Sequence, residues 1–155
     1  MKVESTIPSS PRLAVPRDAI LSGRHTALQA FWDDIGRQGA PLVEIDPEDE
    51  TQSLVTLLWQ ADRDTHNVAV LGAFKPYLDL ANNQLTRLLE TDLWYRTDRV
   101  QADVRAWYRL APNDSLEPPR DWAARTAAFQ PDPLNPRRFT VVGGTDNPFA
   151  PHTEI

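Results

Sequence analysis

The sequence predicts an all-β protein that folds as an antiparallel β-sandwich with one amphipathic helix near its start. Two observations indicate this fold class. Five or so short runs of apolar and β-branched residues are separated by turn residues, and strands and helices do not alternate as they do in a parallel sheet. The 155 residues suffice for one domain with a hydrophobic core and are too few for two ordinary domains.

The first segment, residues 1–20, carries three prolines among small polar residues. Prolines at Pro8, Pro11 and Pro16 interrupt regular structure, and the segment has no apolar stripe. We therefore expect a flexible N-terminal arm, with the folded domain spanning residues 21–145.

A helix is predicted over residues 24–37. Leu28, Phe31 and Ile35 recur at helical spacing and form an apolar stripe. Gly39, followed by a proline two residues later, provides a stop signal.

The next segments are expected to be a loop, a hairpin and a second loop. Residues 44–52 (EIDPEDETQ) are rich in acids, which is typical of a solvated loop. The apolar runs at 53–59 and 67–72 are joined by polar residues, which indicates a β-hairpin. Residues 74–90 are predicted to be a loop that contains at most one helical turn.

Two strands are predicted next, at residues 92–97 (DLWYRT) and 103–110 (DVRAWYRL). A short helix is predicted over residues 120–129, between prolines, and a final strand over residues 138–144. Residues 146–155 are expected to form a tail or linker.

Composition excludes several kinds of partner. Lys and Arg number 16 against 22 Asp and Glu, so the net charge of −6 opposes binding to nucleic acid or an anionic membrane. No run approaches the roughly 18 apolar residues of a membrane span, and no secretory leader is apparent. Cysteine is absent, which permits a reducing compartment, and we expect a cytoplasmic location.

The search for catalytic and metal-binding motifs finds none. The three histidines, His25, His66 and His152, fall in different predicted elements without metal-ligand spacing. No serine sits in the G-x-S-x-G turn that exposes the nucleophile of an α/β-hydrolase. The chain is therefore expected to need no cofactor of its own and to work as a binding or accessory module.

The strongest candidate for a binding surface lies in the two strands at 92–97 and 103–110. Side chains alternate between the faces of a strand. One set is the expected core face: Val104, Ala106, Tyr108 and Leu110. If the two strands pair, the opposite face carries the candidate ligand-binding residues: Trp94, Arg96, Arg105, Trp107 and Arg109.

Such a face suits a flat, aromatic, negatively charged ligand. Tryptophan offers a stacking surface, and arginine offers several planar donors to anionic oxygens. Two structural alternatives remain open. The arginine stems can simply cover the tryptophans, or the leading helix can bury them.

Several of these segments, in this order, are similar to the N-terminal domain of the enterochelin esterases, the ferric enterobactin hydrolases. The similar segments are FWDDIGRQGAPLVE, SLVTLLW, TDLWYRT, AWYRL and DPLNP, between residues 26 and 139. The resemblance implies an immunoglobulin-like (E-set type) β-sandwich that precedes an α/β-hydrolase domain. That second domain would carry the serine nucleophile and cleave a tris-catecholate siderophore for iron release in the cytoplasm. Iron then enters only as part of the ferric siderophore, and no catalytic residue transfers to this chain.

One position departs from the family pattern. The resemblance implies an arginine after the LW of the first long strand, whereas Gln60 follows Trp59 here. Two other functions stay open on the sequence: a carbohydrate-binding module with tryptophan platforms, and a structural domain that packs against the hydrolase domain.

Overall fold

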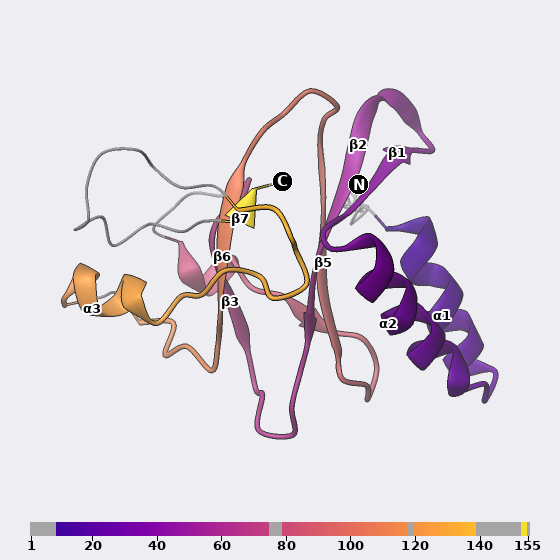
Figure 1. The fold of residues 1–155 in the computed structure, drawn as a ribbon, viewed down its shortest axis with the longest axis horizontal. Helices are drawn as coiled ribbons and strands as arrows, with labels where there is room; N and C mark the ends of the chain where they lie inside the picture. Colours follow the sequence, from indigo (N-terminus) through magenta and orange to yellow (C-terminus); the bar gives the residue numbers. More distant parts are fainter. Residues whose placement is uncertain (1–8, 75–78, 118–119, 139–152, 155) are drawn as a thin grey trace, which may run out of the picture.

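The structure, a computed structural model, describes residues 9–74, 79–117, 120–138 and 153–154. Two antiparallel sheets face each other (Figure 1). The first sheet has the order β1-β2-β5-β4, with strands Leu42–Asp46, Asp49–Gln60, Leu93–Gln101 and Thr86–Arg87. The second has the order β3-β6-β7, with strands Val68–Gly72, Trp107–Pro112 and Thr153–Glu154.

The main core lies between the sheets, as in a sandwich. Alternate residues of β2 and β5 point inward and meet the inward residues of β3 and β6. The fully or nearly fully buried members are Val55, Leu57, Val68, Val70, Leu85, Val100, Tyr108 and Leu110. The predicted all-β, sandwich-like class is confirmed at this level.

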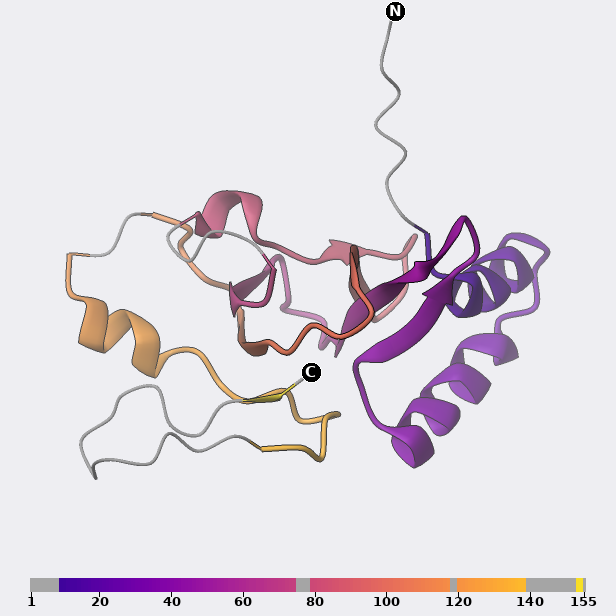
Figure 2. The ribbon, with the colours of Figure 1, turned by 90° about the horizontal axis from the view of Figure 1, so that it is seen from above.

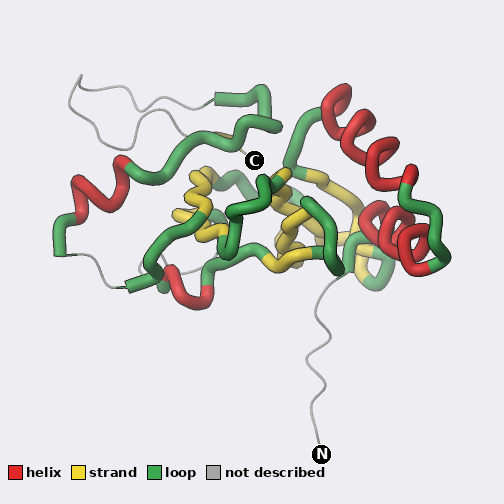
Figure 3. The backbone as a smooth tube through the Cα atoms, turned by 90° about the horizontal axis from the view of Figure 1, so that it is seen from below, coloured by secondary structure: helices red, strands yellow, loops and turns green. Residues whose placement is uncertain are grey.

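Two helices cover the outer face of the first sheet. They are α1 (Pro11–Leu21) and α2 (Thr26–Gln38), which lie side by side on one flank, whereas α3 (Trp122–Ala127) lies at the opposite flank (Figures 1, 2 and 3). The predicted helices at 24–37 and 120–129 are therefore confirmed. Gly39 ends α2 with a φ of 84°, and a Cβ there would lie 2.8 Å from Pro136 Cδ, so only glycine fits this turn without strain.

The expectation of a flexible arm over residues 1–20 is wrong for the part that the structure describes. Proline is tolerated in the first helical turn, where the backbone N–H has no partner within the helix, and Pro11 occupies that position in α1. The side chain of Ser10 caps the helix by accepting a hydrogen bond from the Leu13 N–H at 3.2 Å. Leu13 and Ala19 are each only 5% exposed. The helix was missed because its apolar residues do not form a stripe on one face and its prolines resemble those of a linker.

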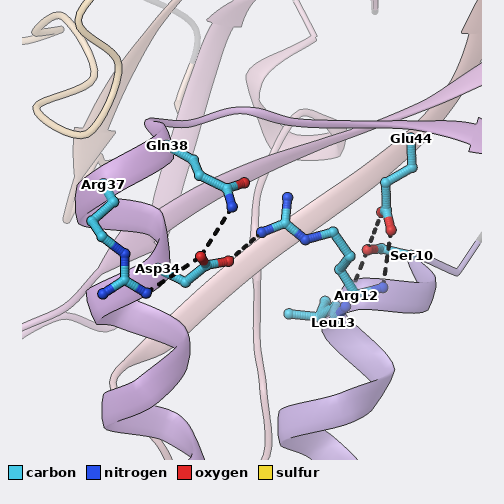
Figure 4. A network of polar contacts seen from close by, with 7 residues as sticks. All are labelled: Ser10, Arg12, Leu13, Asp34, Arg37, Gln38 and Glu44. Carbon is cyan, nitrogen blue, oxygen red and sulfur yellow. Dashed lines mark hydrogen bonds and ion pairs between the residues drawn. The ribbon is translucent and has the colours of Figure 1, made fainter.

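A polar network holds α1 against α2 and β1 (Figure 4). The Ser10 hydroxyl and the Arg12 backbone N–H both donate to the Glu44 carboxylate on β1, the second at 2.9 Å. The Arg12 guanidinium pairs with Asp34 of α2, which also accepts a 3.0 Å hydrogen bond from Gln38. The N-terminal helix is thus tied to both neighbouring elements.

The predicted loop at 44–52 and the predicted hairpin at 53–59 and 67–72 are both wrong. The acidic segment is the turn of the β1–β2 hairpin, in which Val43 pairs with Val55. Its acids do not prevent strand pairing, because most of them stay in water and the buried Asp46, 1% exposed, pairs with Arg99. Strand β2 pairs with β1 and β5, whereas β3 pairs with β6 in the other sheet. The segment between β2 and β3 therefore crosses from one sheet to the other.

The predicted loop at 74–90 is close to the structure in the part described. It contains a 3-10 turn at Leu80–Asn82 and then the short strand β4. The predicted final strand at 138–144 lies outside the described residues except for Arg138. Among the described residues, no helix has the length and apolar character of a membrane span.

Candidate functional site

The five candidate ligand residues do not share one face. Strands β5 and β6 lie in different sheets. Trp94 and Arg96 are on the inner face of β5 and point into the space between the sheets. Trp107 packs on the outer side of the second sheet, against the cluster that contains Phe129. Arg105 precedes β6 and is exposed. The pairing assumed from sequence is wrong because alternation assigns faces within a strand and not the sheet to which the strand belongs.

The predicted core face of the second segment is partly confirmed. Tyr108 and Leu110 are 0% exposed, but Val104 is 40% exposed because β6 begins only at residue 107. Ala106 is half-buried. Arg109, expected on the ligand-binding face, is only 7% exposed.

A different group of tryptophans and arginines comes together at the end of the sandwich where the chain crosses from β2 to β3. We call this group the Trp–Arg end; its residues are Trp59, Arg63, Arg87, Trp94 and Arg96. Trp59 pairs with Trp94, and Trp94 pairs in turn with Arg87, so β2, β5 and β4 place these three in one row across the inner face. The inward direction of Leu57 was a sufficient signal for Trp59, two residues later on the same strand. Arg63 and Arg87 lie in a loop and a two-residue strand, where alternation has no force.

A cavity of about 340 Å³ opens beside this row. Trp94, Arg63 and Arg87 line it together with three acids, Asp62, Glu90 and Asp92. Arg87 is braced by a 2.7 Å hydrogen bond from its Nε to the Thr91 carbonyl. Arg63 makes no hydrogen bond or ion pair with any residue that the structure describes, so its donors can receive a ligand.

The acids of the cavity are partly occupied. Asp62 Oδ1 accepts hydrogen bonds from the Asp64 N–H at 3.0 Å and the Thr65 hydroxyl at 2.9 Å. Asp92 accepts from Trp32 Nε1 at 3.0 Å and from Gln60 Nε2 at 3.1 Å. Gln60, which stands where the family resemblance implies an arginine, therefore donates a hydrogen bond to Asp92, one of the residues that line this cavity.

Arg96 lies deeper, between the sheets, with its side chain 11% exposed. Its Nε donates to Asp98 at 2.7 Å, and its Nη1 donates to Asn83 Oδ1. Asn83 in turn donates to the Val70 carbonyl of the second sheet at 2.7 Å. This chain of bonds fixes the guanidinium in one orientation.

Two buried donors at the Trp–Arg end have no acceptor among the residues that the structure describes: Trp59 Nε1 and Arg96 Nη2. A buried donor without a partner costs about 1–3 kcal/mol of folding free energy, so such groups call for an explanation. With indole surfaces, guanidinium groups and unpaired N–H donors, this end of the sandwich can bind a flat, oxygen-rich molecule without covalent chemistry. No group of three or more His, Asp or Glu that could hold a metal ion occurs among the described residues.

The DPLNP segment forms a structural brace. Tyr108, at 0% exposed, donates from its hydroxyl to Asp132 Oδ2 at 2.6 Å. Burial raises the pKa of the Asp132 carboxyl, although hydrogen bonds from Tyr108 and the Leu134 N–H oppose the shift. The Leu134 carbonyl accepts from the Ala40 N–H at 2.9 Å. The segment therefore joins the second sheet to the connection between α2 and β1.

Comparison with known proteins adds a family to this geometry. Residues 54–149 match the family model described as enterochelin esterase, N-terminal. The chain belongs to this family. The match contains Trp59, Trp94 and the DPLNP segment, which confirms the resemblance seen in the sequence.

Two curated relatives are each 28% identical to the chain. An iron(III) salmochelin esterase of Escherichia coli O6:H1 aligns over 144 residues, which are 92% of this chain and 33% of that protein. An iron(III) enterobactin esterase of Dickeya dadantii aligns over 100 residues, which are 60% of this chain and 22% of that protein. The chain thus spans a third or less of the length of these relatives.

Solved structures support the fold. The ferric enterobactin esterase of Salmonella typhimurium superposes with a TM-score of 0.57 at 18% identity, over 82% of this chain and 35% of that chain. An enterobactin esterase of Shigella flexneri, crystallised in the presence of enterobactin, gives 0.53 at 18% identity over 81% and 34%. At this identity the likeness concerns the fold.

Proposed function

We propose that this chain is the non-catalytic N-terminal domain of a cytoplasmic enterochelin esterase and helps to bind a ferric catecholate siderophore. The family match over residues 54–149 is the observation that carries the proposal. The named substrates of the relatives, iron(III) enterobactin and iron(III) salmochelin, suggest the class of ligand. We further propose that the sandwich is of the immunoglobulin-like E-set type, with its two antiparallel sheets as support.

The Trp–Arg end is the proposed binding surface. Catechol rings are flat and can stack on an indole such as that of Trp94. Arginine donors can bind the anionic oxygens of a ferric tris-catecholate; Arg63 and Arg87 lie at the cavity, and Arg87 is also paired with Glu90 at 3.3 Å. The domain would act by holding and orienting the siderophore, which lowers the entropic cost of its reaction elsewhere.

The ester cleavage itself is assigned to an α/β-hydrolase domain. The 155 residues contain no G-x-S-x-G turn, and the curated relatives are at least three times as long as the region they share with the chain. In this proposal the serine nucleophile, its histidine partner and the release of iron belong to that second domain.

Titration with ferric enterobactin, followed by tryptophan fluorescence, tests the proposal. We expect saturable quenching that weakens in Trp94→Ala and persists in Trp107→Ala, the matched control on the outer side of the second sheet. Absence of saturable quenching, or equal loss in both variants, would contradict binding at the Trp–Arg end.

A second candidate, a carbohydrate-binding module, is favoured by the charge of the cavity. Its lining contains three acids and two arginines, so it has no net positive charge that would favour an anionic ligand over a neutral one. Binding of neutral glycans that needs Trp94 but survives Arg63→Gln and Arg87→Gln would support this function. If no small ligand binds and only a separately expressed hydrolase domain protects the tryptophans from quenchers, the domain serves packing alone.

A further inference from the structure

The two unpaired donors, Trp59 Nε1 and Arg96 Nη2, come from neighbouring positions of one surface. The register pairs Trp59 with Trp94 and Leu57 with Arg96, so Trp59 and Arg96 are diagonal neighbours on the inner face of the first sheet. Both donor atoms are buried. Because the two donors come from diagonal positions, one bridging water or two oxygens of a single ligand would complete both.

The walls around this place are aromatic. Trp59 and Trp94 are half-buried and pack against the core between the sheets. Phe74, which follows β3 in the second sheet, packs against the same core and is also half-buried. A ring that entered here would meet flat apolar surfaces, with N–H groups available to an oxygen on its edge.

We propose that Trp59 Nε1 and Arg96 Nη2 form a subsite for the hydroxyl or phenolate oxygen of a catechol ring. The inference rests on the proposed function and assigns the part of the siderophore that enters between the sheets. Arg96 is prepared for this role because its other two guanidinium nitrogens are already held by Asp98 and Asn83. Little freedom is lost when the third nitrogen gains an acceptor.

Charge separates this subsite from the neighbouring cavity, which Trp94 lines. Asp98 pairs with Arg96 at 2.7 Å, so the buried guanidinium brings little net charge to the space between the sheets. The subsite therefore recognises an oxygen acceptor on the ring, whereas Arg63 and Arg87 respond to the total charge of the ligand. Removal of ring oxygens and addition of salt should then affect binding independently.

Two iron-free ligands of equal charge test the subsite: 2,3-dihydroxybenzoylglycine and benzoylglycine, which differ only by the two ring hydroxyls. We expect the 155-residue chain to bind the dihydroxy compound about tenfold more tightly, as calorimetric titration would show. Trp59→Phe and Arg96→Gln should bring the affinity ratio close to one and leave the affinity for benzoylglycine unchanged. Trp107→Phe and Arg105→Gln are the matched controls and should keep the ratio.

A wild-type chain that binds both compounds equally, or a ratio that survives in Trp59→Phe, would overturn the subsite. If ferric enterobactin still quenches the tryptophans in that case, the proposed function stands without it. If neither compound nor ferric enterobactin binds, both proposals fail. Thermal unfolding of each variant establishes that it is folded. Because Trp59→Phe and Arg96→Gln each remove one of the two donors, the two variants test the subsite separately.

Discussion

The two faces of the first sheet differ in the hydrogen bonding of the indole N–H groups that their tryptophans carry. On the helical flank, Trp32 is 7% exposed and its indole N–H donates to Asp92 at 3.0 Å. On the inner face, Trp59 has a buried indole N–H with no acceptor in the described part of the chain. Packing alone favours satisfied polar groups, so an unsatisfied buried donor calls for an explanation, and a bound ligand is the one we propose. The comparison thus contrasts a structural face with the proposed binding end.

The largest effect is expected on the helical flank. Ile35 of α2 is 0% exposed and lies in the cluster that joins the helices to the sheet. Ile35→Ala should lower the free energy of unfolding by about 2–5 kcal/mol, as measured in urea, because it removes buried methyl groups and leaves a cavity. Ile45→Ala, at a site 70% exposed, should change it by less than about 0.5 kcal/mol. Equal costs would show that the helices do not pack as described.

The two tryptophans themselves give the next effect. Trp32→Phe should cost about 1.5–3 kcal/mol because it removes a hydrogen bond to a charged carboxylate. Trp59→Phe removes an N–H that has no partner among the described residues and should cost about 1 kcal/mol or less. Chemical unfolding of both variants measures the difference. A larger cost for Trp59→Phe would mean that its indole has a structural partner.

The brace at Asp132 predicts a pH-dependent effect. Burial raises the pKa of this carboxyl above its ordinary 3.8. The stability that its neutral form contributes is therefore present below that ordinary pKa and lost as the pH rises through the raised one. Asp132→Asn cannot ionise, so its unfolding free energy should improve relative to the wild type as the pH rises from about 4 through the raised pKa, by at most about 1.4 kcal/mol per pH unit. Urea unfolding across that range measures the change, and a constant difference would contradict it.

The smallest effect concerns the network at the start of the chain. Arg12 and Asp34 are 35% and 34% exposed at their side chains, so water screens their ion pair. Arg12→Ala should cost about 1 kcal/mol or less, and less still in high salt. Arg17→Ala, whose partner Asp18 is its exposed neighbour in sequence, is the control and should cost nothing measurable. A large, salt-independent loss would place Arg12 in the core.

Local patterns predicted the elements better than their partners. The stripe of Leu28, Phe31 and Ile35 located α2, and alternation correctly assigned Tyr108 and Leu110 to the core. Nothing local states whether a strand pairs with its neighbour in sequence, because pairing depends on contacts formed after the chain has crossed between sheets.

For the candidate site, too, the position of a residue within its strand was predicted better than the strand's partner. Trp94 and Arg96 were predicted and lie at the Trp–Arg end, whereas Trp107 was grouped with them and lies on another sheet. Trp59 was missed, although its own strand placed it inward, because the assumed hairpin paired β2 with the wrong partner. Which strands pair with one another is therefore the information that local sequence patterns lack here.

The most direct test of a binding end distinct from a structural flank follows the indole N–H signals by ¹H–¹⁵N NMR. Gallium(III) enterobactin, a diamagnetic substitute for the ferric complex, would be added to the labelled chain, with signals assigned from single Trp→Phe variants. We predict that the signals of Trp59 and Trp94 shift in a saturable way while that of Trp107, on the outer side of the second sheet, stays in place. Shifts confined to Trp107, or none at all, would contradict the account.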